Sequence, residues 1–458
     1  MNESLIYPGV KVAIMGLGVS GRAAVRYCLH CGAEVFVSDN RPEQLFLAEE
    51  GEFLATADIK WEASGHSRQF LGQAELLLVS PGVNLQLPLL KTLRDDGVVI
   101  AGEFAVAAGQ IDVPVVAVSG TNGKTTVTTL IGKIFEDAGK RVFIGGNIGT
   151  PLYEYLLEPE DYDIVVAEVS SFQLESAGDF FPDVGLLLNI SPDHLDRHIS
   201  MAKYVQAKMN LFVHQRSGTV AIINGDDLLC SNLPPNLQSV VRTFSKKDGS
   251  TAVISDNRIT IDVDGEKEEY IFEGREDTDQ INDITKMNYA AAILAVRSQG
   301  CTHLETQAGL NSFCPLPHRI EFVAEVNGVS YYNDSKATNT GAVIGALSQF
   351  RGNVILLAGG RDKGDDFHLL KESVVSKVKK MVVLGEATGL LEDALAEVVD
   401  ISPVQSMEDA VTTAAGNAVP GDVVLLSPAC ASFDMFTSYG HRGNEFKKAV
   451  LTLQTNLE

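Results

Sequence analysis

Short runs of β-branched and aliphatic residues alternate with segments of helical periodicity along most of the chain. Near the N-terminus, residues 11–16 predict a strand, residues 20–32 a helix that ends at Gly32, and residues 33–39 a second strand. Apolar runs of the same kind recur at residues 115–120, 141–149, 163–171, 184–191, 218–225, 353–360, 379–386 and 422–429. Strands that alternate with helices pair in parallel through crossover connections, so the pattern predicts an α/β fold.

Two interruptions of this pattern predict domain boundaries. Residues 107–114 contain glycine and proline just before a buried strand, and residues 313–319 carry two prolines. We therefore expect three α/β domains, at residues 1–110, 111–315 and 316–458. A patch of alternating polar and apolar residues at 251–272 predicts an antiparallel hairpin within or beside the second domain.

Composition and charge limit the classes of partner. The 458 residues are 45% hydrophobic and 21% charged, which is typical of a globular protein, and the formal net charge is -24. Nucleic acids and anionic membranes attract cationic surfaces, so we expect neither nucleic-acid binding nor membrane insertion. No apolar run approaches the roughly 18 residues that span a bilayer, and the N-terminus does not resemble a signal peptide. We expect a cytoplasmic monomer.

The six cysteines do not form a metal-binding or disulfide pattern. Cys28 and Cys31 are the one C-x-x-C pair, and no second pair completes a zinc site. Both fall late in the first predicted helix, and we expect reduced thiols throughout.

The first glycine-rich loop follows the first predicted strand. Gly16, Gly18 and Gly21 have G-x-G-x-x-G spacing, and Asp39 ends a second strand about twenty residues later. Such a loop lets a diphosphate approach the helix N-terminus, where backbone amides favour negative charge. A nicotinamide cofactor is one candidate ligand, and a tight turn without ligand is the structural alternative.

A second glycine-rich loop, SGTNGKTT at residues 119–126, is shorter than the usual phosphate-binding loop. The shorter loop still has the groups that bind a nucleotide triphosphate. Backbone amides can line a nest, Lys124 can reach β- and γ-phosphate oxygens, and the Thr125 hydroxyl can reach Mg²⁺. A chain with one nucleoside-diphosphate fold and one triphosphate loop is not a simple dehydrogenase. It is suited to bringing a nucleotide-linked substrate to ATP.

Eight motifs occur in the order found in one enzyme family. They are GTNGKTT (120–126), GGNIG (145–149), EVSSFQLE (168–175), NISPDHLDRH (189–198), PHR (317–319), NDSKATN (333–339), LLAGGRDKG (356–364) and LSPACASFDMF (426–436). Over nearly its whole length the chain resembles the Mur ligase family, which includes folylpolyglutamate synthetase. The last two motifs are similar to those of the member that adds D-glutamate.

The resemblance implies a fold and an activity. The fold would comprise an N-terminal Rossmann-like domain that binds the UDP-substrate, a central P-loop ATPase-like domain with a mostly parallel sheet, and a C-terminal Rossmann-like domain that binds the amino acid. The activity would be ATP-dependent ligation of D-glutamate to UDP-N-acetylmuramoyl-L-alanine in peptidoglycan precursor synthesis. ATP and Mg²⁺ would be required, and the reaction would pass through an acyl phosphate and a tetrahedral intermediate.

The resemblance also implies roles for individual residues. The catalytic set would be Lys124, His194, Lys208 and Lys336, and the metal ligands would be Thr125, Glu168, His194 and a carbamylated Lys208. ATP would contact Gly120, Thr121, Asn122, Gly123, Lys124, Thr125, Thr126, Asn288, Arg319 and Asp334. The UDP-substrate would contact Gly16, Leu17, Gly18, Asp39, Asn40, Arg41, Ser80, Gly82, Asn147 and Ser170. D-glutamate would contact Thr338, Lys363, Ser432 and Tyr439.

The sequence departs from the family pattern at two of these places. Tyr439 stands where the family has a phenylalanine, and Thr285 replaces the earlier asparagine of the motif in which Asn288 is retained. Read from the residues alone, Lys208 is an ordinary helical lysine. A free ammonium about 4 Å from a divalent ion would be repelled by about 8 kcal/mol at an effective dielectric near 20, so beside a metal it must move or be modified.

Three alternatives remain open from the sequence. Within the family, the chain could be a Mur or folylpolyglutamate-type ligase for another amino acid. From other classes, it could be an NAD-dependent oxidoreductase fused to a P-loop module, or a P-loop switch protein that hydrolyses nucleotide without ligation.

Overall fold

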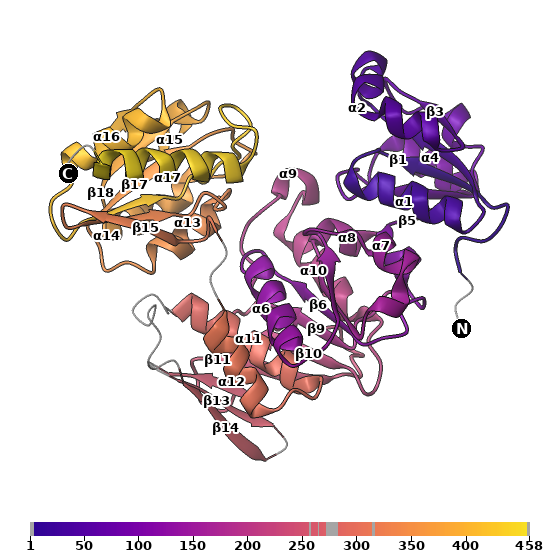
Figure 1. Cartoon of the computed structure of the whole chain (residues 1–458), viewed down its shortest axis with the longest axis horizontal. Coiled ribbons are helices and arrows are strands. Elements are labelled where there is room, and N and C mark those ends of the chain that lie inside the picture. The colour runs from indigo at the N-terminus through magenta and orange to yellow at the C-terminus, as the bar shows by residue number, and fades with distance from the viewer. Residues whose placement is uncertain (1–3, 256–257, 264, 272–282, 314–316, 456–458) are drawn as a thin grey trace. The chain divides into compact units, whose positions relative to one another are not determined.

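The computed structural model describes residues 4–255, 258–263, 265–271, 283–313 and 317–455. It contains three α/β domains, each built around its own sheet (Figure 1). The expected fold class is confirmed, because most strand pairs are parallel and helices lie between consecutive strands.

The first domain has a five-stranded parallel sheet in the order β3-β2-β1-β4-β5. Its strands are β1 (Lys11–Met15), β2 (Glu34–Ser38), β3 (Ile59–Glu62), β4 (Leu76–Val79) and β5 (Val99–Ala101). Its helices are α1 (Val19–His30), α2 (Glu43–Thr56), α3 (Arg68–Leu71), α4 (Pro88–Asp95) and α5 (Glu103–Ala107). The first two strands and the helix between them lie where the apolar pattern predicts them.

The second domain has a nine-stranded sheet in the order β14-β13-β12-β11-β10-β9-β6-β8-β7. Its strands are β6 (Val115–Ser119), β7 (Val142–Gly146), β8 (Ile164–Glu168), β9 (Val184–Leu187), β10 (Val220–Asn224), β11 (Val240–Ser245), β12 (Ala252–Ile254), β13 (Arg258–Val263) and β14 (Glu266–Ile271). Strands β12, β13 and β14 pair antiparallel, which confirms the predicted hairpin. Residues 256–257, 264 and 272 of that prediction lie outside the described residues.

The helices associated with this second sheet vary widely in length. They are α6 (Lys124–Asp137), α7 (Leu152–Leu157), α8 (Ser171–Glu175), α9 (Leu195–His198), α10 (Met201–Val213), α11 (Asp283–Ser298), α12 (His303–Ser312) and the 3₁₀ helix η1 (Pro159–Asp161).

The third domain has a six-stranded sheet in the order β15-β16-β20-β17-β18-β19, with one antiparallel pair, β15 and β16. Its strands are β15 (Glu321–Val326), β16 (Val329–Asn333), β17 (Val354–Gly359), β18 (Val378–Leu384), β19 (Ile401–Pro403) and β20 (Val423–Leu426). Its helices are α13 (Thr340–Leu347), η3 (Phe367–Leu370), α14 (Lys371–Lys377), α15 (Thr388–Leu395), α16 (Met407–Asn417) and α17 (Tyr439–Thr455).

The strands that these apolar runs form are buried on both faces of the sheet. In β1, Val12 and Ile14 belong to one hydrophobic cluster, while Ala13 and Met15 belong to another. The same division separates Leu356 from its neighbour Leu357 in β17. A parallel sheet covered by helices on both faces requires such unbroken apolar strands.

In each sheet, the strand order reverses beside a strand that is followed by one of the sequence motifs. β1 lies between β2 and β4, β6 lies between β8 and β9, and β20 is inserted between β16 and β17. In open α/β sheets, the loops at the carboxyl ends of strands on either side of such a reversal form a crevice that binds ligands.

The chain forms two compact units. One consists of the described parts of Met1–Ile190, Ala202–Thr278 and Lys286–Phe313, and the other of Ser191–Met201, Asp279–Thr285 and Cys314–Glu458. The segment Ser191–Met201, which carries His194, therefore packs with the C-terminal part of the chain. Within the described ranges, no helix combines the length and the apolar composition needed to cross a membrane.

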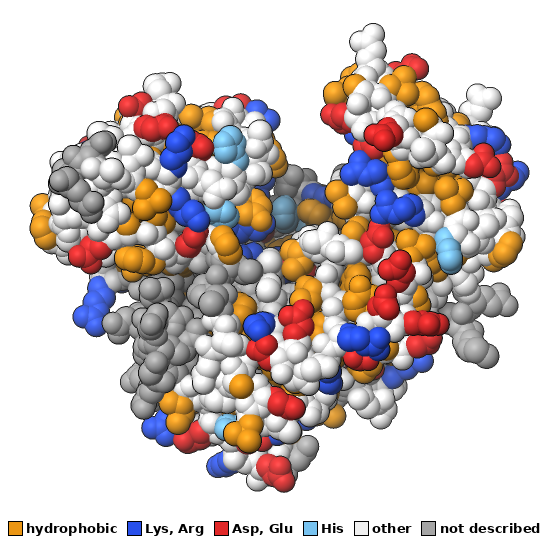
Figure 2. All heavy atoms as spheres, in the orientation of Figure 1, with side chains coloured by type: hydrophobic (Ala, Val, Ile, Leu, Met, Phe, Trp, Pro, Cys, Tyr) orange, Lys and Arg blue, Asp and Glu red, His pale blue; other side chains and the backbone are white. Residues whose placement is uncertain are grey.

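The cysteines that the structure describes, Cys28, Cys31, Cys230, Cys301 and Cys430, are free thiols. Cys314 lies outside the described residues. On the face shown in Figure 2, acidic and basic side chains are intermixed over the surface, so neither charge forms a single continuous field there.

Candidate active site

The first glycine-rich loop connects β1 to α1 in a conformation that needs glycine. Gly16 has φ +94°, and a Cβ added at Gly21 would lie 2.1 Å from the carbonyl oxygen of Gly16. α1 begins after Gly18 without a side-chain cap. The Ser80 hydroxyl, at the end of β4, donates to the Gly16 carbonyl over 3.1 Å. The first turn of α1 therefore presents backbone amides without a side-chain cap, as an anion site requires.

Asp39 and Arg41, which follow the neighbouring strand β2, hold this loop. The Asp39 carboxylate accepts from the Leu17 amide over 2.8 Å and from Arg41 Nε over 2.9 Å, and Arg41 Nη2 donates to the Leu17 carbonyl. Burial opposes ionisation of Asp39, but the hydrogen bonds from Arg41 and Leu17 outweigh it and lower its pKa to about 2. Gly82 and Asn40 are exposed near these strand ends.

Six of the predicted UDP-substrate residues thus lie in one connected set: Gly16, Leu17, Gly18, Asp39, Arg41 and Ser80. Asn147 and Ser170 lie in the second domain instead. The Asn147 side chain donates to Glu168 Oε1 over 2.7 Å, and Ser170 caps α8 through a capping box with Gln173.

The second glycine-rich loop follows β6 and is fixed by Asn189, at the end of β9. The Thr121 amide donates to the Asn189 carbonyl, and the Asn189 side chain exchanges two hydrogen bonds with the backbone of Asn122, at 2.8 and 2.9 Å. The Thr121 hydroxyl contacts the Tyr204 hydroxyl at 3.0 Å. Sequence reasoning missed the role of Asn189, although the residue lies in one of the quoted motifs.

α6 begins at Lys124, directly after this loop. Gly123 has φ +87°, and a Cβ there would meet the Asn288 side-chain oxygen at 2.7 Å. The structure thus brings Asn288, on α11, against the loop. Lys124 Nζ donates to the carbonyls of Gly120 and Thr121, both over 2.9 Å, so the ammonium lies against the backbone of its own loop. Thr125 and Thr126 follow in the first turn of α6.

Glu168 ends β8, the strand next to β6 in the sheet. The residue is buried, and among the residues that the structure describes its Oε2 atom has no hydrogen-bond partner, whereas Oε1 accepts from Asn147. A buried carboxylate oxygen without a donor is costly unless a cation or a proton satisfies it.

Lys208 lies on α10 and is fully buried, with 1% of its surface exposed. Its Nζ donates to the Gly120 carbonyl over 2.8 Å and lies 4.7 Å from the centre of the Tyr204 ring. The sequence alone favours an exposed helical lysine here, so burial against the phosphate-loop carbonyl is a finding of the structure.

His194 adopts a left-handed backbone conformation, with φ +54°. Its Nε2 is 3.6 Å from Asp193, and the buried Asp193 carboxylate accepts from the Asn339 side chain over 3.0 Å. Asn339 also caps α13. This network attaches the His194 segment to the C-terminal unit.

In the third domain, the loops after β16, β17 and β20 carry most of the remaining predicted residues, while Arg319 precedes β15 and Tyr439 begins α17. Asp334 is buried and accepts from the Ser427 hydroxyl over 2.8 Å. Burial raises the pKa of Asp334 to about 7, and the Ser427 hydrogen bond and the charge of Arg319 oppose that shift only in part. Two predicted ATP-binding residues, Arg319 and Asp334, are therefore close enough to interact.

Tyr439, the first residue of α17, packs against Lys336. The ammonium lies 3.9 Å from the centre of the Tyr439 ring, a cation–π contact. Ser432 is buried in the loop after β20, Thr338 is half-buried, and Lys363 is exposed near Asp365. The ring of Tyr439 thus has a defined partner in Lys336, although the family pattern has a phenylalanine at this position.

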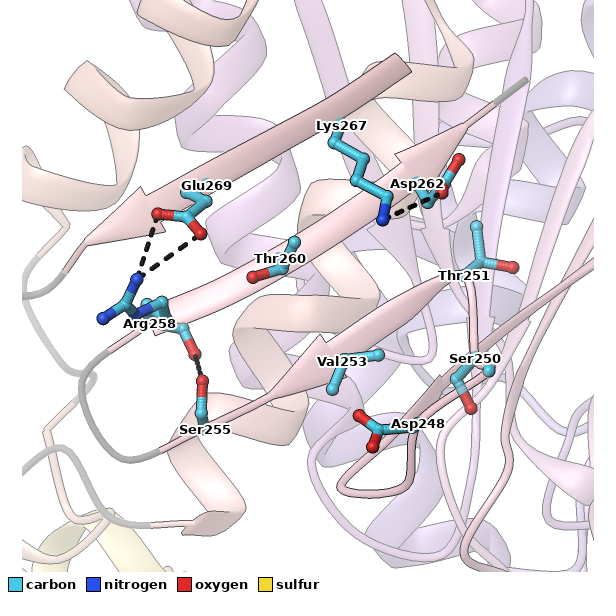
Figure 3. Close-up of a pocket in the computed structure, with 11 residues that line it drawn as sticks. Asp248, Ser250, Thr251, Val253, Ser255, Arg258, Thr260, Asp262, Lys267 and Glu269 are labelled. Carbon is cyan, nitrogen blue, oxygen red and sulfur yellow. Dashed lines mark hydrogen bonds and ion pairs between the residues drawn. The ribbon is translucent and has the colours of Figure 1, made fainter. Parts of the chain in front are cut away.

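A separate pocket lies on the antiparallel extension of the second sheet (Figure 3). Its walls come from β12, β13 and β14 and the turn before them. Arg258 pairs with Glu269 at 3.2 Å, and Lys267 approaches Asp262 at 4.0 Å. None of the predicted site residues lines this pocket, so it is distinct from the glycine-rich loops.

Two glycine-rich loops lie at the switch points of separate α/β domains, an arrangement typical of multidomain nucleotide-binding proteins. Comparison with known proteins identifies the family. Residues 10–102 match the model for the Mur ligase MurD-like N-terminal domain, residues 118–296 the Mur ligase middle domain, and residues 318–430 the Mur ligase glutamate ligase domain. The chain belongs to the Mur ligase family.

Curated relatives match the chain almost from end to end. It is 48% identical over 442 residues to the UDP-N-acetylmuramoylalanine--D-glutamate ligase of Desulfotalea psychrophila, covering 96% of each chain. It is 39% identical over 450 residues to the ligase of the same name from Geotalea uraniireducens, covering 97% of each.

Solved structures share the fold at lower sequence identity. A pseudomurein peptide ligase type C from Methanothermus fervidus aligns with a TM-score of 0.59 and 17% identity, covering 97% of this chain and 100% of that one. The MurF ligase of Thermotoga maritima in complex with ADP gives a TM-score of 0.59 and 19% identity, covering 98% and 96%.

Proposed function

We propose that this protein is an ATP-dependent ligase that joins D-glutamate to UDP-N-acetylmuramoyl-L-alanine, giving ADP and phosphate, in peptidoglycan precursor synthesis. The observation that carries the proposal is the 48% identity, over 96% of both chains, to a ligase of that name. The two glycine-rich loops support it, because the reaction needs one nucleotide as substrate carrier and another as phosphoryl donor.

Amide formation from a carboxylate requires a leaving group on the carboxyl carbon. Transfer of the γ-phosphoryl group of ATP to the alanyl carboxylate gives an acyl phosphate. The amine of D-glutamate attacks it through a tetrahedral intermediate, and phosphate leaves. The reactants are all anionic, so the protein must supply cations and orient the groups.

The residues of this chain divide that task by domain. The first loop, with Asp39 and Arg41 behind it, would bind the uridine diphosphate. Loop 120–126 would bind the ATP phosphates, with Lys124 turning from its own carbonyls to the β- and γ-phosphates. Arg319 would contact the γ-phosphate and Asp334 the ribose, and Lys336 would stay close to the reacting phosphate.

The amino-acid site would use side chains from three loops of the third domain. D-glutamate carries two carboxylates, so its site needs cations and hydroxyl donors. Lys363 would supply the charge, Thr338 and Ser432 the hydroxyls, and Tyr439 one wall of the pocket.

The residues present fit a magnesium ion. Glu168 Oε2 is buried with no donor from the described part of the chain, and the Thr125 hydroxyl lies in the first turn of α6. Mg²⁺ commonly binds one or two protein oxygens and completes its shell with phosphate oxygens and water. When bound, it would neutralise charge on the ATP phosphates. A second ion would use His194 and Lys208, the latter as a carbamate, which turns a buried ammonium into an anionic oxygen ligand.

The decisive experiment is phosphate release by the purified protein with ATP, Mg²⁺ and UDP-N-acetylmuramoyl-L-alanine across a panel of L- and D-amino acids. We expect release with D-glutamate, and only when both the UDP-substrate and the amino acid are present. Release with another amino acid would identify a different ligase of the family. Release without any amino acid would instead indicate a nucleotide switch protein.

The oxidoreductase alternative makes a different prediction for ligand binding. A dinucleotide enzyme should be stabilised against thermal unfolding by NAD(H), whereas the ligase should be stabilised by the UDP-substrate and should not respond to NAD(H).

A further inference from the structure

Arg442 is the largest fully buried side chain of the described residues, with 1% of its surface exposed. It lies in the first turn of α17, on the face that also buries Phe446, Ala449 and Val450. This spacing is that of a helix face turned to a core, where an arginine is unusual and expensive.

The guanidinium joins loops that follow three strands of the third sheet. Nε donates to the Ser335 hydroxyl over 3.0 Å, and Nη2 donates to the Ser335 carbonyl over 2.9 Å, both just after β16. Nη1 and Nη2 each donate over 3.1 Å to the Cys430 carbonyl, after β20. Longer contacts of 3.4 Å reach the carbonyls of Ala431 and of Gly359, the last residue of β17.

The acceptors recorded for this guanidinium in the described part of the chain are carbonyl and hydroxyl oxygens, without a carboxylate. Burial lowers the pKa of Arg442 to about 10, so the group stays protonated at neutral pH. A buried cation satisfied by carbonyl and hydroxyl oxygens fixes the loops that supply them, because each loop loses its partner if the group is removed.

The neighbouring backbone is shaped to admit the guanidinium. Gly360 has φ +130°, and a Cβ there would lie 2.2 Å from the Ala431 carbonyl oxygen and 3.1 Å from Arg442 Nη1. The Ser335 hydroxyl, which accepts from Arg442, donates in turn to the Tyr439 carbonyl over 2.8 Å. The start of α17 and the loop after β16 are thereby locked together.

These three loops carry the residues proposed to bind ATP and the amino acid. Ser335 lies between Asp334 and Lys336, Ser432 follows Ala431, and Lys363 belongs to the loop that follows Gly359. We infer that Arg442 is a positioning residue, which acts through Ser335 and the loop carbonyls to set the amino-acid site of the third domain. This inference rests on the proposed function.

Arg442→Lys tests the inference, because it retains the charge and most of the volume but loses the planar fork that reaches several loops at once. We expect KM for D-glutamate to rise by about tenfold or more, with KM for the UDP-substrate within about twofold of wild type. Ser335→Ala retains Arg442 and removes one acceptor, so KM for D-glutamate should rise in the same direction but less.

Val450→Ala is the matched control. Val450 is buried on the same helix and packs in the core, so its truncation lowers stability without touching the loops. A residue that only stabilises the domain would lower the folded fraction, and so the apparent kcat, with both KM values unchanged. Melting temperatures of all three variants calibrate this comparison.

The outcomes separate the inference from the proposed function. Wild type and Val450→Ala report whether D-glutamate is ligated at all. An unchanged KM for D-glutamate in Arg442→Lys, beside the same loss of stability as Val450→Ala, would overturn the positioning role. If Arg442→Lys does not fold, Ser335→Ala decides, and an unchanged KM in that variant would overturn the inference.

Discussion

Among single residues, Lys208 is the one whose burial and contacts most restrict the role its side chain can have. Its ammonium is buried between the Gly120 carbonyl and the Tyr204 ring, directly behind the proposed phosphate loop. Beside a divalent ion this charge would be repelled, and reaction with CO₂ would convert it to a carbamate that attracts the ion. The ammonium form therefore suits the carbonyl and ring that surround Lys208 here, and the carbamate form suits a neighbouring divalent ion.

Lys208→Ala should lose most of the phosphate release, by about a hundredfold or more, because no side chain then completes the second ion site. The matched control is Lys203→Ala, an exposed position on the same helix, which should retain wild-type turnover. Growth of a labelled carbamate signal with ¹³C-bicarbonate in wild type, absent in Lys208→Ala, would identify the modification. Near-normal turnover in Lys208→Ala would refute the role.

Asp334 predicts a pH dependence of stability. Its folded pKa of about 7 is raised by burial above the unfolded value of about 4. The folded state binds this proton more tightly, so the stabilising effect is complete below about pH 4 and is lost as the pH rises through about 7. Asp334→Asn cannot titrate, and its stability relative to wild type should therefore increase from about pH 5 to about pH 8.

Urea unfolding of wild type and Asp334→Asn at both pH values measures this difference. Asp393→Asn, an exposed position of the same domain, is the control and should follow wild type. Parallel stability curves for wild type and Asp334→Asn would contradict the raised pKa.

At the scale of elements, the two ends of α6 provide a matched pair of glycines. Gly123 precedes the helix with φ +87°, and Gly139 follows it with φ +81°. A Cβ at Gly123 would lie 2.7 Å from Asn288 Oδ1, whereas a Cβ at Gly139 would meet no atom of the described residues within 4 Å. The backbone strain of an alanine is thus the same at both positions, and the steric cost differs.

Gly139→Ala should lower the free energy of unfolding by about 1 kcal/mol and leave KM for ATP unchanged. Gly123→Ala should lower it at least as much and raise KM for ATP severalfold, because Asn288 and the loop must move apart. Initial rates of phosphate release and urea unfolding measure both quantities. Equal KM values for the two variants would show that the Gly123–Asn288 approach does not shape the nucleotide site.

The elements themselves were predictable where one local signal dominates. Unbroken apolar runs such as residues 115–120 identify strands buried on both faces, and the alternation at 251–272 identifies the hairpin. Contacts that depend on tertiary structure were not predictable. Asn189 resembles any polar residue after a strand until β9 places it beside the loop after β6.

For Arg442, the sequence contains a signal that the residue is buried, but that signal does not identify the groups that bind its charge. Its spacing to Phe446, Ala449 and Val450 places it on the buried face of α17, which helical periodicity alone can reveal. The carbonyls that compensate its charge come from loops about ten and about a hundred residues away in the chain, so no local pattern contains them. The attachment of the His194 segment to the C-terminal unit through Asn339 is non-local for the same reason.

For the whole molecule, the balance of charge is the dominant physical constraint. The chain has a formal net charge of -24, and the proposed reaction brings together a triphosphate, a diphosphate and several carboxylates. Basic side chains such as Lys124, Lys208, Arg319 and Lys336 are assigned to the proposed sites, but four single charges do not offset this many anions. Divalent cations are the remaining source of positive charge.

Metal removal tests that balance in the intact protein. With EDTA in excess of all divalent ions, phosphate release in the presence of ATP, D-glutamate and the UDP-substrate should fall to background, and excess MgCl₂ should restore it. Lys124→Ala should lose release in the same assay even at saturating MgCl₂, because the ion does not replace the lysine at the β- and γ-phosphates. The melting temperature of the ligand-free protein should be unaffected by EDTA, which separates a metal needed for chemistry from one needed for folding. Product formed equally well in EDTA would mean that the anionic reactants are neutralised by side chains alone, and the proposed roles of Thr125 and Glu168 would then be wrong.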